Sequence, residues 1–439
     1  MIVRGGTVVL PGAVPVPADI AVEDGVIAAI GPDLEPSGED LDARGLHVLP
    51  GAVDAHVHFN EPGRADWEGW GSGTAALAAG GATACVEMPL NAHPPTVDGE
   101  AFDRKVEAAL GSAKVDFALW GGLVPGPLDR LDELAERGVA GFKAFMCDTG
   151  IDDFDAVDDD QLGAGMERAA ALGLPVAVHA ERPAGLRPMD GGDWRAWVAS
   201  RPPAAELAAI ERAIELAEQA VCALHVVHVS TGAGVAAVAA ARERGADVTC
   251  ETCPHYLALT EDDLERLGTL AKCAPPLRPT AECEALWEHL ARGRIALVAS
   301  DHSPCPRAMK AGGFAAAWGG IAGAETTVAL LLSEGAARGL PLAPLADLVT
   351  GAPARRLRLP KGRLEAGADA DLALLELGGE QPLGEEHLHD RHRANPFAGR
   401  PLRARVVRTL LRGRTVFHDG GVAPGAHGRL LTPHERIRA

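Results

Sequence analysis

The sequence lacks the features that would place it at a membrane or on a nucleic acid. No apolar run among its 439 residues approaches the roughly 20 residues of a transmembrane helix. Basic residues are outnumbered 61 to 41, giving a formal net charge of −20, which argues against a phosphate-rich partner. The opening residues lack the basic segment and apolar core of a signal peptide. We expect a cytoplasmic protein with a small-molecule substrate and no nucleic-acid or membrane partner.

A disulfide framework is also absent. The eight cysteines are spread along a long chain, mostly in apolar, strand-like segments, as in proteins of a reducing compartment. The "CETC" at 250–253 has the spacing of a redox motif, but it lies in a strand-like run and does not open a helix. We expect buried structural thiols.

Short apolar runs alternate with longer helical segments through the middle of the chain. The runs are residues 51–59, 82–91, 115–124, 138–146, 174–181, 223–230, 247–256 and 295–303. Between them lie segments such as 204–220, whose apolar residues recur at helical spacing. Eight strands separated by helices predict parallel β/α units, and the number eight suggests a closed barrel. We expect an α/β fold with a (β/α)8 TIM-like barrel at 51–355.

Both chain ends have a strand-rich composition instead. Residues 1–50 contain Val- and Ile-rich runs, and the Asp24-Gly25 pair between two of them is typical of a hairpin. Strand-like runs return after residue 356. We expect residues 1–50 and 356–439 to join in a small β-sandwich domain formed by both chain termini.

Six chemically unusual residues lie within these apolar runs. They are His56, His58, Lys143, His179, His228 and Asp301. The carboxyl ends of parallel barrel strands open on one face, where active sites are built. A single histidine there is more often structural, and a single acid often caps the next helix. Alternate residues of a strand point to the same side, which pairs His56 with His58. The coincidence of six indicates a functional site.

Lys143 is the most anomalous of the six. The chain has 6 lysines against 35 arginines, and this one lies between phenylalanines in "GFKAFM". Burial of a lysine is costly unless it is paired, and burial lowers its pKa. A neutral amine can react with carbon dioxide to give an anionic carbamate, whose two oxygens can bridge two metal ions. The alternative is a lysine with a buried stem and an ammonium group that reaches solvent.

Four histidines, a carbamate and an aspartate suit two divalent metal ions. Zn²⁺ is the first choice, and Co²⁺, Mn²⁺ and Fe²⁺ are alternatives. Such ions lower the pKa of bound water from about 15.7 to about 7 and polarise a carbonyl group. Asp301 can take the proton and return it to a leaving nitrogen. The pattern predicts a metal-dependent hydrolase.

These motifs resemble those of the amidohydrolase superfamily and, within it, of the cyclic amidohydrolases. "DAHVHF", "GFKAFM", "PVAVHAE", "VVHVS" and "ASDHS" follow the family's order across nearly the whole chain. The resemblance implies a barrel with a β-sandwich, and a centre with His56 and His58 on one metal and His179 and His228 on the other. It further implies Lys143 as a bridging N6-carboxylysine, Asp301 as ligand and catalytic proton shuttle, and a homotetramer.

Further segments resemble allantoinases in particular. They are "HFNEPGRADWEGW", "MPLNAHPPT", "ETCPHYLAL", "KCAPPLR", "SDHSPCP" and "AWGGIAG". Dihydroorotases carry a carboxylate-binding arginine where Asn60 stands. Hydantoinases and dihydropyrimidinases carry a tyrosine soon after the lysine, whereas the one tyrosine here is Tyr256. The resemblance implies that a metal-bridged hydroxide opens allantoin to allantoate, a step of purine degradation. Hydantoinase-, dihydropyrimidinase- or dihydroorotase-like hydrolysis and a non-catalytic scaffold relative are the alternatives.

Substrate contacts are less well defined by the sequence. The candidates are Asn60, Asn91, Ala274 and Gly319, the last two through backbone groups. Asn91 could contact the ring or the ureido group, and its alternative is a turn residue after a strand. His225 competes with His228 as a ligand, but three residues along a strand face opposite sides, and the motif favours His228.

Overall fold

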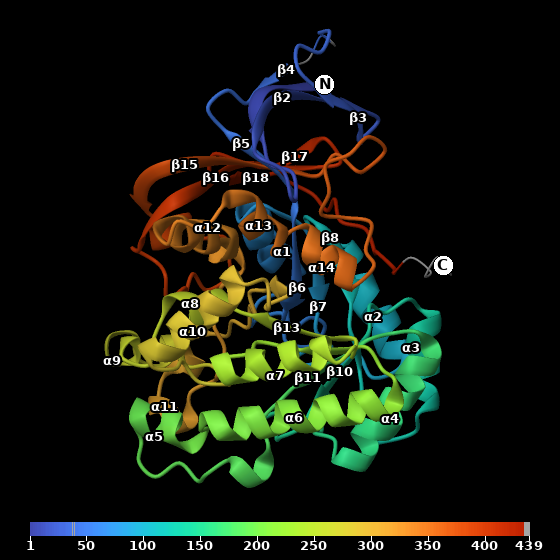
Figure 1. Cartoon of the computed structure of the whole chain (residues 1–439), viewed down its shortest axis with the longest axis vertical. Coiled ribbons are helices and arrows are strands. Elements are labelled where there is room, and N and C mark those ends of the chain that lie inside the picture. The colour runs from blue at the N-terminus through green and yellow to red at the C-terminus, as the bar shows by residue number, and fades with distance from the viewer. Residues whose placement is uncertain (37, 39, 434–439) are drawn as a thin grey trace.

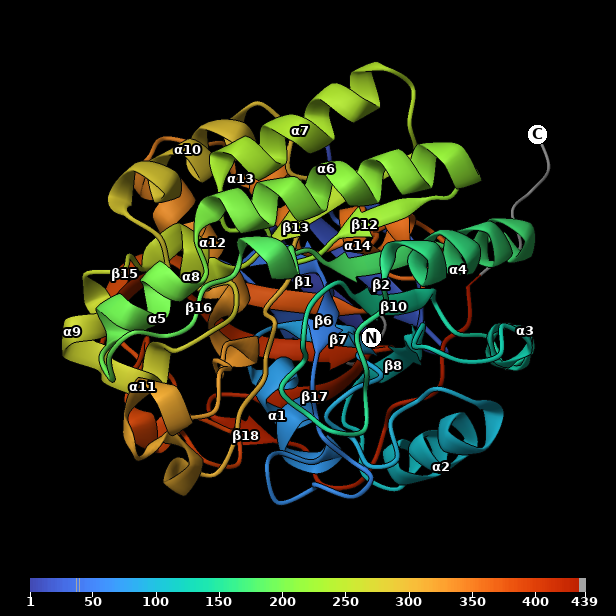
Figure 2. The same ribbon diagram turned by 90° about the horizontal axis from the view of Figure 1, so that it is seen from below.

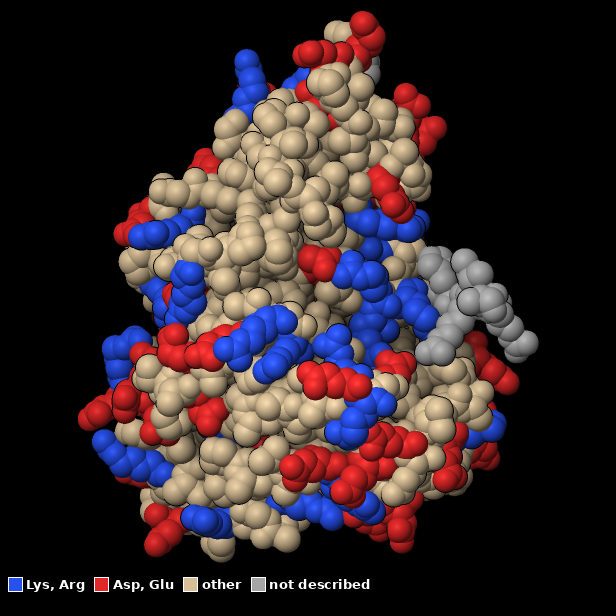
Figure 3. Space-filling model, viewed as in Figure 1, with Lys and Arg blue, Asp and Glu red and all other residues tan. Residues whose placement is uncertain are grey.

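The computed structural model describes residues 1–36, 38 and 40–433. A sheet holding the strands of both chain ends lies at one end of the molecule, and a helix-wrapped barrel fills the rest (Figure 1). Within the described residues no helix is both long and apolar enough to cross a membrane. On the face in Figure 3, charged side chains of both signs lie over the helices, while the surface over the terminal strands is largely uncharged.

Eight parallel strands of the described chain form the barrel. They are β6 (Ala52–Val57), β7 (Ala82–Glu87), β8 (Asp116–Leu119), β10 (Phe142–Phe145), β11 (Val176–His179), β12 (Leu224–Val226), β13 (Val248–Thr252) and β14 (Leu297–Val298). Each of the eight predicted apolar runs contains one of them. They are buried almost throughout, as expected of strands covered on both faces.

Hydrogen bonding closes the ring of strands. β6, β7 and β8 form one sheet, and β9 (Gly121–Gly122) through β14 form the other. Only Trp120 separates β8 from β9, so one apolar run joins the two sheets. On the other side Val57 bridges to His302, and the backbone N–H of His58 donates to the carbonyl of His302 at 2.7 Å. The predicted closed barrel is confirmed.

The helices surround these strands (Figure 2). They are α1 (Trp70–Ala79), α2 (Gly99–Leu110), α3 (Asp129–Glu136), α4 (Asp159–Leu172), α5 (Trp194–Ser200), α6 (Pro203–Ala220), α7 (Gly232–Glu243), α8 (Pro254–Ala258), α9 (Asp263–Leu267), α10 (Thr280–Ala291), α11 (Gly313–Ala316), α12 (Thr327–Ala337), α13 (Leu342–Asp347) and α14 (Gly351–Arg356). In α6, buried Ala209, Ile210 and Ala213 recur at helical spacing and pack on the core. Cys253 stands directly before α8, so "CETC" does lead into a helix, contrary to expectation; its two thiols are nevertheless buried and free.

The chain ends share one mixed sheet of nine strands within the described residues. Its strands are β1 (Ile2–Val8), β2 (Val16–Glu23), β3 (Val26–Gly31), β4 (Asp40–Asp42), β5 (His47–Pro50), β15 (Leu372–Pro382), β16 (Pro401–Leu411), β17 (Arg414–His418) and β18 (Gly421–Val422). Asp24 and Gly25 form the β2–β3 turn with positive φ of 50° and 81°. The antiparallel pairing of β15 with β5 joins the two ends. The predicted β domain built from both termini is confirmed.

A buried ionic cluster fastens this domain to the barrel. The Lys361 ammonium lies 2.6 Å from a carboxylate oxygen of Asp116, at the start of β8, and 2.7 Å from oxygens of both Asp369 and Asp371. The Lys361 side chain is fully buried. We propose residues 51–355 as the barrel domain and 1–50 with 356–439 as the second; of the latter, residues 434–439 lie outside the described residues.

Candidate metal centre

One cavity of about 620 Å³ gathers most of the predicted site residues at the carboxyl ends of the barrel strands. His56, His58, His179, His228 and Asp301 line it. His56 belongs to β6 and His179 ends β11, while His58, His228 and Asp301 follow their strands. Residues that are up to 245 positions apart therefore meet, as the barrel geometry predicts.

The loops beyond two strands turn in an unusual way. His228 and Asp301 both have positive φ, 40° and 46°, a conformation that is uncommon for residues other than glycine. Strained backbone of this kind clusters at functional sites, where the surrounding structure holds it. Here it accompanies two side chains that face the cavity.

On one side of the cavity, hydrogen-bond acceptors face one another. His56 Nδ1 lies 2.5 Å from the Glu251 carboxylate and therefore donates its proton to it, so Nε2 carries a lone pair. That Nε2 lies 3.2 Å from Asp301 Oδ1, and His58 Nε2 lies 3.5 Å from the same oxygen. The ligand atoms of His56, His58 and Asp301 all lie within 4.8 Å of one another. A cation between them would relieve this clustering of lone pairs.

On the other side of the cavity, two imidazoles face one another. His179 Nε2 lies 2.8 Å from a Glu181 oxygen and donates to it, which leaves a lone pair on Nδ1. This Nδ1 faces His228 Nε2 at 3.0 Å. Burial lowers the pKa of both imidazoles, which favours the neutral rings that metal ions require.

Lys143 lies fully buried between the two sides. Its ammonium nitrogen has no hydrogen-bond partner among the described residues and stands 4.3 Å from the centre of the Phe145 ring. Burial lowers the pKa of Lys143 to about 7, against the attraction of Glu251 and Asp301. An amine in this state is unprotonated in about half of the molecules at neutral pH.

The donor set fits two divalent cations. Four imidazoles and one buried carboxylate are present, and the ring nitrogens of both histidine pairs face another polar atom. The nitrogen of one buried lysine has no hydrogen-bond partner among the described residues. Imidazole and carboxylate ligands together suit Zn²⁺ and similar ions.

Sequence reasoning missed the carboxylates behind the histidines. Glu251 holds His56, and Glu181 holds His179 while it accepts hydrogen bonds from Arg201 Nε at 3.1 Å. Glu181 stands two residues after His179, so the rule that pairs alternate residues could have found it. Glu251 is an acid inside an apolar strand, the same type of anomaly as Lys143. It lies between Cys250 and Cys253, and the interpretation of this segment considered the cysteines rather than the glutamate.

The candidate substrate contacts divide into two groups. Asn91, Ala274 and Gly319 line the cavity. Asn60 is fully buried and is not among the lining residues, and its amide donates to the carbonyl of Pro304 at 3.4 Å. A direct substrate contact by Asn60 therefore has no support in the structure; its side chain contacts the loop after Asp301.

His225 is excluded from the cavity. Its Nδ1 lies 2.8 Å from Thr249 Oγ1 and its Nε2 lies 3.0 Å from Glu251 Oε2. His228, which the motif favoured, lines the cavity instead.

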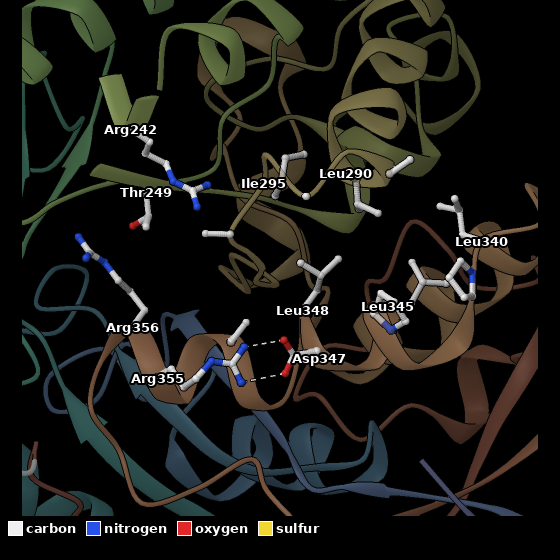
Figure 4. A pocket seen from close by; sticks show the side chains of 16 residues that line it. Arg242, Thr249, Leu290, Ile295, Leu340, Leu345, Asp347, Leu348, Arg355 and Arg356 are labelled. Atoms are coloured by element: carbon white, nitrogen blue, oxygen red, sulfur yellow. Dashed lines mark hydrogen bonds and ion pairs between the residues drawn. The ribbon is translucent and has the colours of Figure 1, made fainter. Parts of the chain in front are cut away.

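A separate cavity of about 580 Å³ lies at the amino ends of the strands. Arg242, Thr249 and Arg356 stand at one end of it, apolar side chains such as Leu345 at the other, and Arg355 pairs with Asp347 (Figure 4). None of the predicted metal ligands lines this cavity. The candidate metal centre therefore lies at the cavity at the carboxyl ends of the barrel strands.

A closed parallel barrel that directs paired imidazoles and a carboxylate into a cavity at its carboxyl face is the architecture of a metal-dependent hydrolase. Comparison with known proteins identifies the family within this class. The model of the amidohydrolase family matches residues 47–416. The chain belongs to the amidohydrolase family and is a metal-dependent enzyme, as the sequence motifs predicted.

Two curated relatives are similar over nearly their full length. An allantoinase from Rubrobacter xylanophilus is 60% identical over 99% of this chain and 97% of its own. An allantoinase from Solibacter usitatus is 51% identical over 98% of this chain and 96% of its own.

Among solved structures, the L-hydantoinase (dihydropyrimidinase) from Arthrobacter aurescens has a TM-score of 0.94 and 35% identity, covering 98% of this chain and 99% of its own. The dihydropyrimidinase from Brevibacillus agri has a TM-score of 0.92 and 30% identity, covering 100% and 99%.

Proposed function

We propose that the protein hydrolyses the cyclic amide bond of allantoin to give allantoate. The observation that carries this proposal is the gathering of five polar side chains from four strands at one barrel cavity, with Lys143 of a fifth strand buried near them. The choice of allantoin is supported by the 60% and 51% identical relatives, which are named allantoinases.

We propose two divalent metal ions as the cofactors of the protein, with Zn²⁺ as the first choice and Co²⁺, Mn²⁺ or Fe²⁺ as alternatives. His56 and His58 would hold one ion, His179 and His228 the other, with Asp301 as a further ligand. When bound, the ions polarise the amide carbonyl and lower the pKa of water to about 7.

Lys143 is proposed to carry a carbamate and so to supply the anionic bridge between the two halves. Three features support this role: complete burial, the lack of a hydrogen-bond partner among the described residues, and a pKa lowered by burial to about 7. A lysine ammonium would repel both cations, whereas the carbamate oxygens would attract them.

Asp301 is the proposed general base and acid. Its position beside His56 Nε2 and His58 Nε2 puts a carboxylate where the attacking water must lose a proton. The water oxygen bonds to the ring carbonyl carbon, and the ring carbon–nitrogen bond then breaks. Asp301 delivers the proton to the departing nitrogen, which leaves a carboxylate on one side and a ureido group on the other.

The residue at position 60 also favours a substrate without a carboxylate. The position where a carboxylate-binding arginine would stand in a dihydroorotase is Asn60, which is buried and turned to Pro304. Asn91 lines the cavity beside Ser303, with its amide nitrogen 3.5 Å from the serine hydroxyl. We propose Asn91 and the backbone at Ala274 and Gly319 as contacts to the hydantoin ring and its ureido group.

We also propose a homotetramer in the cytoplasm. The eight cysteines, all within the described residues, are free and buried, which suits a reducing compartment. The proposed homotetramer follows from the family resemblance alone. Light scattering on the purified protein tests it.

The test is a substrate panel on protein loaded with zinc, cobalt or manganese. Racemic allantoin should be converted to allantoate, with much slower turnover of hydantoin, dihydrouracil and dihydroorotate. Turnover of hydantoins without allantoin would instead assign the hydantoinase function of the solved neighbours.

A further inference from the structure

Glu251, on β13, stands behind the proposed metal ligands and holds several groups at once. Its side chain is 1% exposed. One carboxylate oxygen lies 2.5 Å from His56 Nδ1 and accepts the backbone N–H of His228 at 3.3 Å. The other oxygen lies 3.0 Å from His225 Nε2. A single buried carboxylate thereby contacts one residue on each side of the proposed centre.

These contacts continue away from the cavity. Because His225 Nε2 donates to the carboxylate, its Nδ1 is an acceptor, and the Thr249 hydroxyl donates to it over 2.8 Å. Thr249 lines the second cavity, at the amino ends of the strands (Figure 4). The chain Thr249–His225–Glu251–His56 therefore passes through the barrel interior, and Glu251 fixes the tautomers of both histidines.

The charge on Glu251 is compensated differently from that on Glu181. The described hydrogen-bond partners of Glu251 are two imidazoles and one backbone N–H, with no arginine or lysine. Glu181 accepts from the Arg201 guanidinium as well as from His179. A carboxylate that accepts no hydrogen bond from an arginine or lysine makes the imidazole that it holds a stronger donor to a metal ion than one whose charge is already neutralised.

We propose that Glu251 is a positioning residue that fixes His56 for metal binding and makes the His56–His58–Asp301 half of the centre the tighter of the two. The inference rests on the proposed binuclear centre. The inference adds an order of metal binding to that centre: the first metal ion binds beside His56, and the second binds beside His179 and His228.

The test is a metal titration of the metal-free protein that carries the carbamate, kept under bicarbonate. Co²⁺ is added in competition with a chelator while its visible absorption is recorded. The wild type should bind in two resolved steps. In Glu251→Gln the tighter step should weaken by about 10- to 100-fold, the usual effect of losing a group that orients a metal ligand, and the weaker step should change less than threefold.

Two variants separate positioning from general loss of structure. Glu206 is a matched control, since it is also a buried glutamate, 2% exposed, but it binds Ser230 and Arg278 rather than a metal ligand. Glu206→Gln should leave both steps unchanged. His225→Gln keeps Glu251 but removes its second imidazole, and should weaken the tighter step by less than Glu251→Gln does.

The kinetic parameters supply a further readout. With saturating metal, Glu251→Gln should regain most of its kcat for allantoin while its KM stays within twofold of the wild type. An equal weakening of both steps, or a titration of Glu251→Gln that matches the wild type, would overturn the inference and leave the binuclear centre standing. A wild type that binds no metal would instead overturn the centre itself.

Discussion

The lowered pKa of Lys143 leads to a quantitative prediction about carbamate formation. The reacting species is the neutral amine, so the initial rate at a fixed concentration of dissolved CO2 should follow the neutral fraction. With a pKa of about 7, that fraction is about one tenth at pH 6, about one half at pH 7 and about nine tenths at pH 8. The rate should therefore rise as the pH rises and level off above pH 8.

An ordinary lysine would behave differently. With the unshifted value of 10.5, the neutral fraction would rise about tenfold for each pH unit between 6 and 9. Between pH 6 and pH 8 the two cases predict about a 10-fold and about a 100-fold rise. The structural cause of the difference is the burial of the amine without a hydrogen-bond partner in the described chain.

The assay starts from protein freed of metal and CO2. Carbon-13-labelled CO2 is added with zinc, and the carbamate signal is followed by nuclear magnetic resonance at pH 6, 7, 8 and 9. Lys143→Ala should show no such signal, bind metal weakly and lack activity. A rate that still rises tenfold from pH 8 to pH 9, or a Lys143→Ala variant with full activity, would refute the reasoning.

Two further substitutions test other parts of the structure. Asp301→Asn should retain most of the metal but lose about 10²- to 10⁴-fold in kcat, the usual share of general acid–base catalysis; a loss below tenfold would assign the proton transfer to another group. Lys361→Met leaves Asp371 buried without its cation, whereas Asp116 keeps its pair with Arg412; the uncompensated carboxylate should cost about 3–5 kcal/mol. With an unfolding entropy of about 2.1 cal/mol/K per residue, this cost lowers the Tm by about 3–5 °C in calorimetry. Arg104→Met, which breaks an exposed pair, should change it by less than about 1 °C.

The barrel could be predicted because its signal is periodic and local. Each of the eight apolar runs contains a buried strand, and the separating segments, such as α6, show helical spacing of apolar residues. Lys143 could be found for a related reason, because a charged residue between phenylalanines contradicts the pattern around it.

The remaining parts of the site depend on contacts that are distant in sequence. Glu251 meets His56 across 195 residues, and neither residue's neighbours along the chain indicate the other. Asn60 follows the histidine pair and is a candidate substrate contact by sequence, but it is fully buried, with a φ of 65° and a hydrogen bond to Pro304. Its burial is decided by the loop after β14, which local sequence does not describe.

The central claim is that six side chains hold two metal ions at the carboxyl end of the barrel. The most direct measurement is anomalous X-ray diffraction at the zinc edge from crystals of the zinc-loaded protein. We predict two peaks, one beside His56 and His58 and one beside His179 and His228, with density continuing from the Lys143 amine to a carbamate between them. A single peak, peaks bound by other residues, or an unmodified Lys143 between two ions would contradict the account.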